Sequence, residues 1–196
     1  MIINYKNLDK VSSSDFSFIV EDGRMLFHTE KPCENIIFLN FPSIDFENIT
    51  FKACGFKDCQ EISFHGCKTE ECVFGNVSSI YAQYTTISRC SFTHCCSFGS
   101  LITLEEEGKV EFCVFNHISA LSEDGYIVHF IYRDKKSVEP LKGCCFYDSE
   151  VENSSESFVC CEYLVEDTIY KTEQIDTIDY ASCLVNDEAW KPKYKS

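Results

Sequence analysis

The chain has 196 residues, of which 44% are hydrophobic, which is enough for one well-filled core. Its formal net charge is −15, with acidic residues recurring from Glu123 to Glu188. Such a charge repels phosphate backbones, so we expect no binding to nucleic acid. The chain has no apolar run long enough for a membrane span. Its first ten residues lack the apolar region of a signal peptide, which favours an intracellular protein.

Residues 1–17 show no repeat and are expected to form an N-terminal cap. From residue 18 onward one pattern recurs: an apolar residue, a spacer, a second apolar residue that is usually Phe, a spacer, and then Asn, Asp or His. The copies are Phe18-Val20-Asp22, Ile36-Phe38-Asn40, Cys54-Phe56-Asp58, Cys72-Phe74-Asn76, Cys90-Phe92-His94, Cys113-Phe115-His117, Cys144-Phe146-Asp148 and Cys183-Val185-Asp187. The first five copies are 18 residues apart, and the later intervals lengthen to 23, 31 and 39. A fixed period of this kind is typical of a solenoid.

Each copy predicts three short strands with one buried face, because apolar residues alternate with spacers in three places. The first strand carries the two apolar positions of the pattern. The second is expected at Leu26 and His28, Ile44 and Phe46, Ile62 and Phe64, and Ile80 and Ala82; the third at Ile49 and Phe51, Cys67 and Thr69, and Thr85 and Ile87. A further inward residue is expected after a bend, at Phe41, Cys59, Val77, Cys95 and Ile118.

The polar position that ends each pattern holds only Asn, Asp or His. These residues tolerate positive φ, so the position predicts a sharp bend between two strands, with side chains stacked from coil to coil. This ladder resembles the polar ladder of right-handed parallel β-helices of the pectin-lyase-like superfamily, over residues 18 to about 188. The resemblance is one of architecture and includes no catalytic motif. A left-handed helix with hexapeptide repeats has the same coil length and remains the alternative.

The expected fold is therefore an all-β, single-stranded right-handed parallel β-helix solenoid with coils of about 18 residues that expand toward the C-terminus. The β-helix domain is expected over 18–188, with long insertions at 119–140 and 150–182, and a C-terminal tail at 189–196.

The chain contains 14 cysteines, which in a secreted protein would indicate a disulfide framework. Here, however, Cys alternates with Phe, Ile and Val at the same repeat positions, so it serves as a small hydrophobic residue. We expect mostly free thiols and a cytoplasmic or other reducing intracellular compartment. Zinc binding by Cys54 and Cys59, or by other closely spaced pairs, is not expected, because these residues point to different corners of a filled core.

Catalysis is also not expected. The superfamily's lyases and hydrolases use clustered carboxylates and a basic residue. The three arginines, Arg24, Arg89 and Arg133, are not close in sequence to paired aspartates. The chain contains no Ser-His-Asp order, phosphate-binding glycine loop or nucleotide motif. We predict neither a catalytic residue nor a metal or other cofactor, and a small-molecule ligand is not expected.

Interaction is expected on the expanded coils, which contain seven of the 10 tyrosines. Loops on a rigid scaffold commonly carry function, although these insertions could equally form only a C-terminal cap. The candidate partner-binding residues are Tyr126, Phe130, Tyr132, Tyr163 and Tyr170.

Two functions remain open. The first is a non-catalytic structural or scaffolding protein that docks on a protein partner, including as part of a cytoskeletal or filamentous assembly. The alternative is a carbohydrate-binding or carbohydrate-active β-helix protein, whose aromatic loops would stack on sugar rings.

Overall fold

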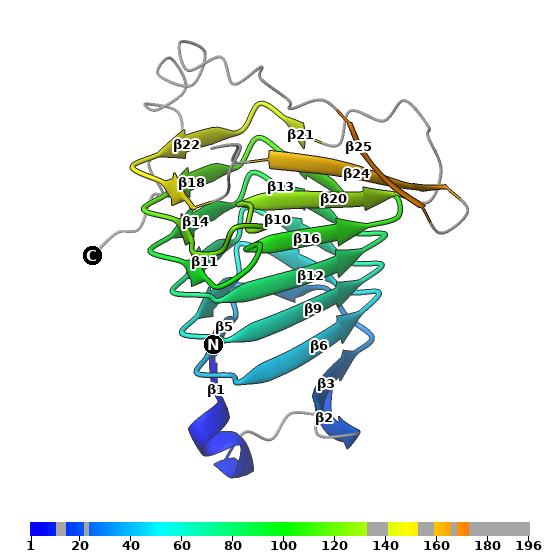
Figure 1. The fold of residues 1–196 in the computed structure, drawn as a ribbon. Helices are drawn as coiled ribbons and strands as arrows, with labels where there is room; N and C mark the ends of the chain where they lie inside the picture. The colour runs from blue at the N-terminus through cyan, green and yellow to red at the C-terminus, as the bar shows by residue number, and fades with distance from the viewer. Residues whose placement is uncertain (11–14, 22–23, 133–140, 153–158, 166–167, 173–196) are drawn as a thin grey trace.

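The computed structural model describes residues 1–10, 15–21, 24–132, 141–152, 159–165 and 168–172. The chain forms an all-β solenoid of about 5 turns, with a coil spacing of about 19 residues. Successive coils stack so that their strands form walls (Figure 1). Helical structure in the described residues is confined to the short 3₁₀ helix η1 (Tyr5–Lys10). None of the described helical residues forms a segment long and apolar enough to cross a membrane.

Three main sheets make up the walls, with a short fourth sheet at one corner. The seven-stranded sheet contains β1 (Ile2–Asn4), β5 (Ile37–Leu39), β8 (Gly55–Lys57), β11 (Val73–Gly75), β14 (Ser91–Thr93), β18 (Val114–Asn116) and β22 (Cys145–Tyr147). The nine-stranded sheet contains β2 (Phe16–Glu21), β3 (Arg24–Thr29), β6 (Ser43–Glu47), β9 (Glu61–His65), β12 (Ser79–Gln83), β16 (Ile102–Glu105), β20 (Val128–Tyr132), β24 (Val159–Val165) and β25 (Thr168–Thr172).

The six-stranded sheet contains β4 (Cys33–Glu34), β7 (Thr50–Lys52), β10 (Lys68–Glu70), β13 (Thr86–Ser88), β17 (Lys109–Glu111) and β21 (Leu141–Lys142). The three-stranded sheet contains β15 (Cys96–Ser97), β19 (Ser119–Ala120) and β23 (Glu150–Val151). From β5 to β22, each regular coil supplies one strand to each main sheet, which confirms the predicted three strands per turn.

A column of phenylalanine rings fills the interior behind the seven-stranded sheet. Phe74 is paired in parallel register with Phe56 on one side and Phe92 on the other. Its ring is stacked on theirs, with centroids 4.9 and 4.6 Å apart and interplanar angles of 8° and 5°. The column continues through Phe38, Phe115 and Phe146. The predicted stack is therefore confirmed.

The predicted bend residues also adopt the expected backbone conformation. Positive φ values between 44° and 62° occur at Asn40, Asp58, Asn76, His94, His117 and Asp148. The backbone N–H of Asn76 donates to the carbonyl oxygen of Thr93 in the next coil at 3.1 Å, and equivalent bonds recur up the column. Hydrogen bonding between coils therefore continues through the bend, as well as along the strands.

The first predicted copy of the repeat is wrong. Phe18 lies in β2, which pairs antiparallel with β3 as a hairpin. The strand beneath Phe38 is instead β1, whose Ile3 is in register with Phe38 and fully buried. Alternation of apolar residues has the same period in a hairpin as in a coil, so the pattern alone could not separate the two.

The strand assigned to Leu26 and His28 is wrong by one residue. Phe27 is the residue in register with Phe46, and it is buried, whereas His28 is exposed. A shift of one residue reverses the face of every side chain in a strand.

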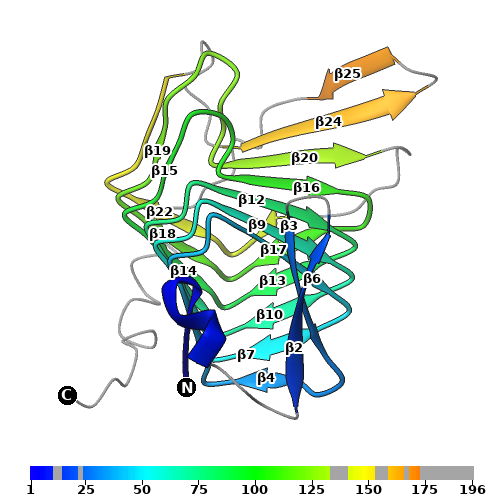
Figure 2. The same cartoon turned by 90° about the horizontal axis from the view of Figure 1, so that it is seen from below.

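Aromatic side chains close the N-terminal end of the core. The rings of Phe16 and Phe18 in β2 both contact Phe27, and Phe18 is also stacked against Phe41. Tyr5 of η1 packs edge-on against Phe41, with centroids 5.7 Å apart. In the view from below, η1 and β2 lie over the end of the coils (Figure 2). The hairpin and η1 therefore cap the solenoid at this end.

The expanded coils continue the nine-stranded sheet. β24 pairs parallel with β20, and β25 then pairs antiparallel with β24. The last predicted copy, Cys183-Val185-Asp187, and the tail at 189–196 lie outside the described residues.

Candidate functional site

The buried side chains are mostly hydrophobic, so the polar side chains lie mainly on the outer faces of the walls. The strongest collection of polar side chains lies on the nine-stranded sheet, where Ile44 and Phe46 point inward and Asp45 and Glu47 alternate with them. We call this face, formed by the outward side chains of β6, β9, β12 and β16, the acidic wall. Its members are Asp45, Glu47, Glu61, Ser63, His65, Tyr81, Gln83, Thr103 and Glu105.

Strand register orders all of these side chains except Glu61 into two columns, and Glu61 lies between Ser43 and Ser79. One runs from Asp45 through Ser63 and Tyr81 to Thr103. The other runs from Glu47 through His65 and Gln83 to Glu105. Within each of these two columns, the coils next to a carboxylate hold a neutral or imidazole side chain. The paired carboxylates that a glycoside hydrolase requires do not occur within either of these columns.

Tyr81 is the centre of the contacts on the acidic wall. Its hydroxyl group donates a hydrogen bond to Glu105 Oε2 at 2.6 Å. Its ring lies 5.9 Å from that of His65, whose Nδ1 is 3.3 Å from Gln83 Oε1. The half-buried Tyr81 is thus held in place by charge-assisted hydrogen bonding.

The sign of the charge on this wall is uniform. Asp45, Glu47, Glu61 and Glu105 are acidic, and the strands β6, β9, β12, β16 and β20 contain no Lys or Arg. A cationic contact to this wall comes from β3, where Arg24 Nη1 is 3.9 Å from Asp45 Oδ2. A surface of one sign attracts ligands of the opposite sign, here cationic ones.

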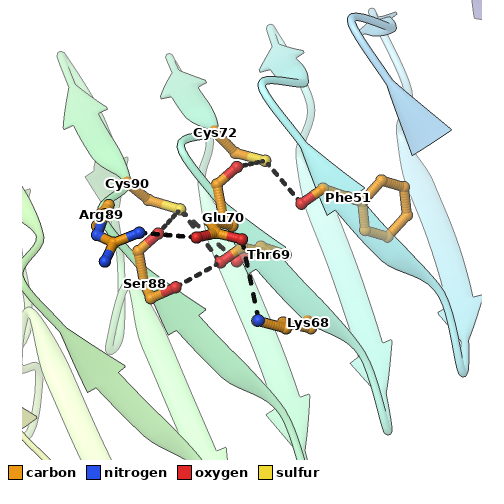
Figure 3. A network of polar contacts seen from close by, with 8 residues as sticks. All are labelled: Phe51, Lys68, Thr69, Glu70, Cys72, Ser88, Arg89 and Cys90. Atoms are coloured by element: carbon orange, nitrogen blue, oxygen red, sulfur yellow. Dashed lines mark hydrogen bonds and ion pairs between the residues drawn. The ribbon is translucent and has the colours of Figure 1, made fainter. Parts of the chain in front are cut away.

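The six-stranded sheet presents a face of mixed charge. Arg89 Nη1 donates to Glu70 Oε1 at 2.8 Å, and Lys68 Nζ is 3.9 Å from Glu70 Oε2 (Figure 3). Outward residues of this sheet include Lys52 and Glu111 on the same column as Glu70. Because positive and negative charges alternate there, this face has no single electrostatic preference, and such exposed ion pairs contribute little to stability.

The cysteines behind this face are structural. Cys72 and Cys90 belong to a buried column with Cys54, Cys113 and Cys144, one on each of five neighbouring coils. The thiols also donate to backbone carbonyls, as Cys72 Sγ does to Glu70 at 3.4 Å (Figure 3). Among the described side chains, eleven cysteines are free, whereas Cys145 is disulfide-bonded.

Burial keeps several thiols protonated. It raises the pKa of Cys33 to about 12, and those of Cys59 and Cys67 to about 11. In the thiol column, the hydrogen bond from Cys72 lowers the pKa of Cys54 to about 7, but Cys54 is only 1% exposed. A buried thiol of this kind cannot reach a substrate. Within the described part of the chain, no group of three or more His, Cys, Asp or Glu side chains is placed to hold a metal ion.

The predicted partner-binding residues divide into two sets. Tyr126 is 7% exposed and Phe130 is fully buried, so neither offers its ring to a partner. Phe130 points inward above Leu104, and the Tyr126 ring contacts that of His129 at 5.5 Å. These two residues belong to the packing of the expanded coil, which was the alternative reading of the insertion.

The backbone brings the other three together. Tyr132 of β20 is in register with Tyr163 of β24, which is in register with Tyr170 of β25. The three residues therefore occupy facing positions on adjacent strands of the sheet that also carries the acidic wall. Their side chains lie outside the described set.

Sequence reasoning missed the acidic wall itself. The signal was available in the spacers of the second strand, where Asp45, Glu47 and Glu61 stand between apolar residues. Comparison with protein-family models, curated proteins and solved structures finds no match to this chain.

Proposed function

We propose that this protein is a non-catalytic scaffold that docks a basic segment of a protein partner on its acidic wall. The main support for this proposal is the charge of the acidic wall, where four carboxylates lie on strands that contain no Lys or Arg. A lysine- or arginine-rich segment lying along the coils would meet carboxylates in both columns. Electrostatic complementarity of this kind gives specificity and speeds association.

Rigidity supports the scaffolding role. Stacked aromatic rings fill the core, and backbone hydrogen bonds link neighbouring coils at both strands and bends. The spacing between carboxylates on different coils is therefore held by the fold. A fixed charge pattern costs a partner less ordering entropy than a flexible one would.

The proposal also covers the cellular compartment of the protein and its family relationship. The ten buried free thiols among the described cysteines suit a cytoplasmic or other reducing environment. We also propose that the solenoid is right-handed and that the chain is related to the pectin-lyase-like superfamily. Both proposals rest on the polar ladder.

Charge reversal tests the docking surface. We expect Glu47→Lys with Glu61→Lys to weaken binding of a lysine-rich peptide at least about 10-fold, since both residues are exposed on the wall. The matched control is Glu34→Lys with Glu71→Lys, which changes the net charge equally but lies at the six-stranded sheet and its adjoining bend. Titration at low and at physiological salt measures both. Equal loss in the two double variants would mean that net charge alone attracts the peptide, and would overturn the proposal.

A carbohydrate-binding role is the second candidate, favoured by the half-buried ring of Tyr81 beside polar groups of Gln83 and Glu105. Aromatic rings stack on sugars, so Tyr81→Ala would abolish binding to an immobilised glycan panel under this alternative. Under the scaffold proposal, neither the unchanged protein nor Tyr81→Ala should bind a glycan. Glycan binding that is lost in Tyr81→Ala would replace the scaffold proposal with the carbohydrate one.

A further inference from the structure

The polar bend of the seven-stranded sheet changes character along its column. In the lower coils amide and carboxylate groups face one another, and Asn76 Nδ2 donates to Asp58 Oδ1 at 2.8 Å. In the next two coils, the column holds His94 and His117. All of these residues have positive φ near 50° to 60°. Because Asn and Asp serve the bend equally well, the bend itself does not require imidazole rings.

The two rings are placed side by side. Their centroids are 5.0 Å apart and their planes differ by 12°. Their backbones are held by equivalent bonds, His94 N to Asn116 O and His117 N to Tyr147 O, both 3.1 Å. Both side chains are exposed. The fold therefore presents an ordered pair of imidazoles to the surface on consecutive coils, directly after β14 and β18.

Each ring has a hydrogen-bond partner on the nitrogen nearer the backbone. His117 Nδ1 is 3.0 Å from Asn116 Oδ1, and His94 Nδ1 is 2.8 Å from Thr93 Oγ1. An amide oxygen can only accept, so His117 Nδ1 carries the proton in the neutral ring, and the Thr93 hydroxyl can accept in the same way. This leaves the lone pair on Nε2 of His117, and on Nε2 of His94 when the Thr93 hydroxyl accepts. Metal-binding histidines are commonly oriented by such a bond on the other nitrogen.

A carboxylate lies next in the column. Asp148 Oδ2 is 4.0 Å from His117 Nε2, and the Asp148 side chain is 76% exposed and able to rotate. Its negative charge favours a cation beside the imidazoles. Metal–nitrogen bonds are about 2.0–2.1 Å, so the Nε2 edges of the two rings must lean toward each other to share one ion. The exposure of both rings leaves them room to do so.

We propose that His94 and His117 form a surface site for a late first-row divalent metal ion, bound through the two Nε2 atoms. Water completes the coordination, and the Asp148 carboxylate stands beside the ion. Imidazole ligands suit Ni²⁺, Cu²⁺ and Zn²⁺, whereas Ca²⁺ and Mg²⁺ prefer oxygen. The site is separate from the acidic wall and does not depend on the scaffold proposal.

Isothermal titration of the reduced protein with Ni²⁺ in chelator-free buffer tests the site. We expect one ion per chain, with affinity lowered at least about 10-fold in His94→Asn and in His117→Asn, because each variant removes one of two ligands. Asn occupies the same bend position at Asn40 and Asn76, so both variants keep a residue suited to the positive φ. Circular dichroism checks that they fold.

Two controls identify the ligands. His65→Asn removes a single imidazole on the acidic wall, and Cys96→Ser removes the exposed thiol two residues after His94. Both should bind Ni²⁺ as the unchanged protein does, and Asp148→Asn should bind it more weakly. The proposal would be overturned if the unchanged protein did not bind Ni²⁺, if His94→Asn bound Ni²⁺ as tightly as the unchanged protein, or if Cys96→Ser lost Ni²⁺ binding. Titration with Mg²⁺ should give no heat of binding.

Discussion

Phe74 is enclosed by aromatic rings on both sides of its coil and has no exposed surface. Removing its ring would leave a cavity between two stacked neighbours that the rigid coils cannot close. We therefore expect Phe74→Ala to lower the free energy of unfolding by about 3–5 kcal/mol, measured by urea denaturation. Phe98→Ala is the control, because Phe98 is 85% exposed and should change stability by less than about 0.5 kcal/mol. Similar effects of the two substitutions would contradict the buried stack.

Cys59 links a single thiol to the pH dependence of stability. Burial raises its pKa from 9.0 to about 11, so above pH 9 the unfolded thiol ionises while the folded one stays protonated. The stabilising contribution of this group is complete below pH 9 and is lost as the pH rises toward 11. The loss is at most about 1.4 kcal/mol per pH unit for one such thiol.

Cys59→Val isolates that contribution, because Val77 occupies the same position in the next coil. Urea denaturation between pH 8 and pH 11 should show a shallower loss of stability in this variant. The reciprocal substitution, Val77→Cys, adds a buried thiol and should make the loss steeper. Identical slopes in all three proteins would show that Cys59 does not titrate differently in the folded and unfolded chains.

At the scale of the element, each regular coil in the described part of the chain turns at three bends, and each of these bends has a residue with positive φ. Only one column was predicted, because only there do Asn, Asp and His recur. A second column holds Asn35, Ala53, Glu71, Arg89, Phe112 and Gly143; a third holds Asn48, Gly66, Tyr84 and Glu106. These residues share no chemical type, so their conformation is imposed by hydrogen bonding between coils, such as Ala53 N to Glu70 O at 3.0 Å. A single sequence carries no local signal for such a bend.

Tyr84 is the least suited residue of the third column. It has a φ of 50° and is 58% exposed, so its ring gains little from burial. The left-handed conformation costs an ordinary residue about 1–2 kcal/mol, and Asn tolerates it better. We expect Tyr84→Asn to raise the free energy of unfolding by about 0.5–1 kcal/mol, seen as a higher melting temperature in calorimetry. Tyr81→Asn should lower it, because Tyr81 donates the 2.6 Å bond to Glu105. A loss of stability in Tyr84→Asn would show that contacts of the Tyr84 ring contribute more to stability at this bend than the cost of the left-handed backbone conformation.

The strands also show which parts of the fold could be predicted from the sequence. Register at Phe56, Phe74 and Phe92 was predictable because one inward position recurs at a constant interval. The N-terminal strand was not, because Ile3 precedes Phe38 by an interval that the hairpin β2–β3 interrupts. Tyr126 and Phe130, two of the five candidate partner-binding residues, are buried, and the sequence could not show this because an aromatic residue in an insertion has the same composition signal whether it packs inward or faces a partner. His94 and His117 were placed correctly at the bend, but their stacking needs the coordinates of two neighbouring coils.

Across the whole molecule, the cysteines report whether the solenoid behaves as one closed core. Among the described free cysteines, ten are buried and Cys96 is exposed. Alkylation of the native protein, followed by peptide mass spectrometry, should therefore label Cys96 first among them. Cys96→Ser should remove that early product, and the buried thiols should react only as coils open.

Complete alkylation under denaturing conditions then tests the redox state. Without reductant, most of the 14 cysteines should be labelled, with Cys145 among the exceptions because it is disulfide-bonded. Cys72 and Cys90 occupy equivalent positions on neighbouring coils joined by the bond from Ser91 N to Cys72 O, and at the usual strand spacing such a pair can be oxidised to a disulfide in an oxidising compartment. Finding them free in protein purified without reductant supports the reducing compartment. A disulfide between Cys72 and Cys90 would instead show that the thiol column links neighbouring coils covalently. The proposal of an intracellular scaffold would then be wrong.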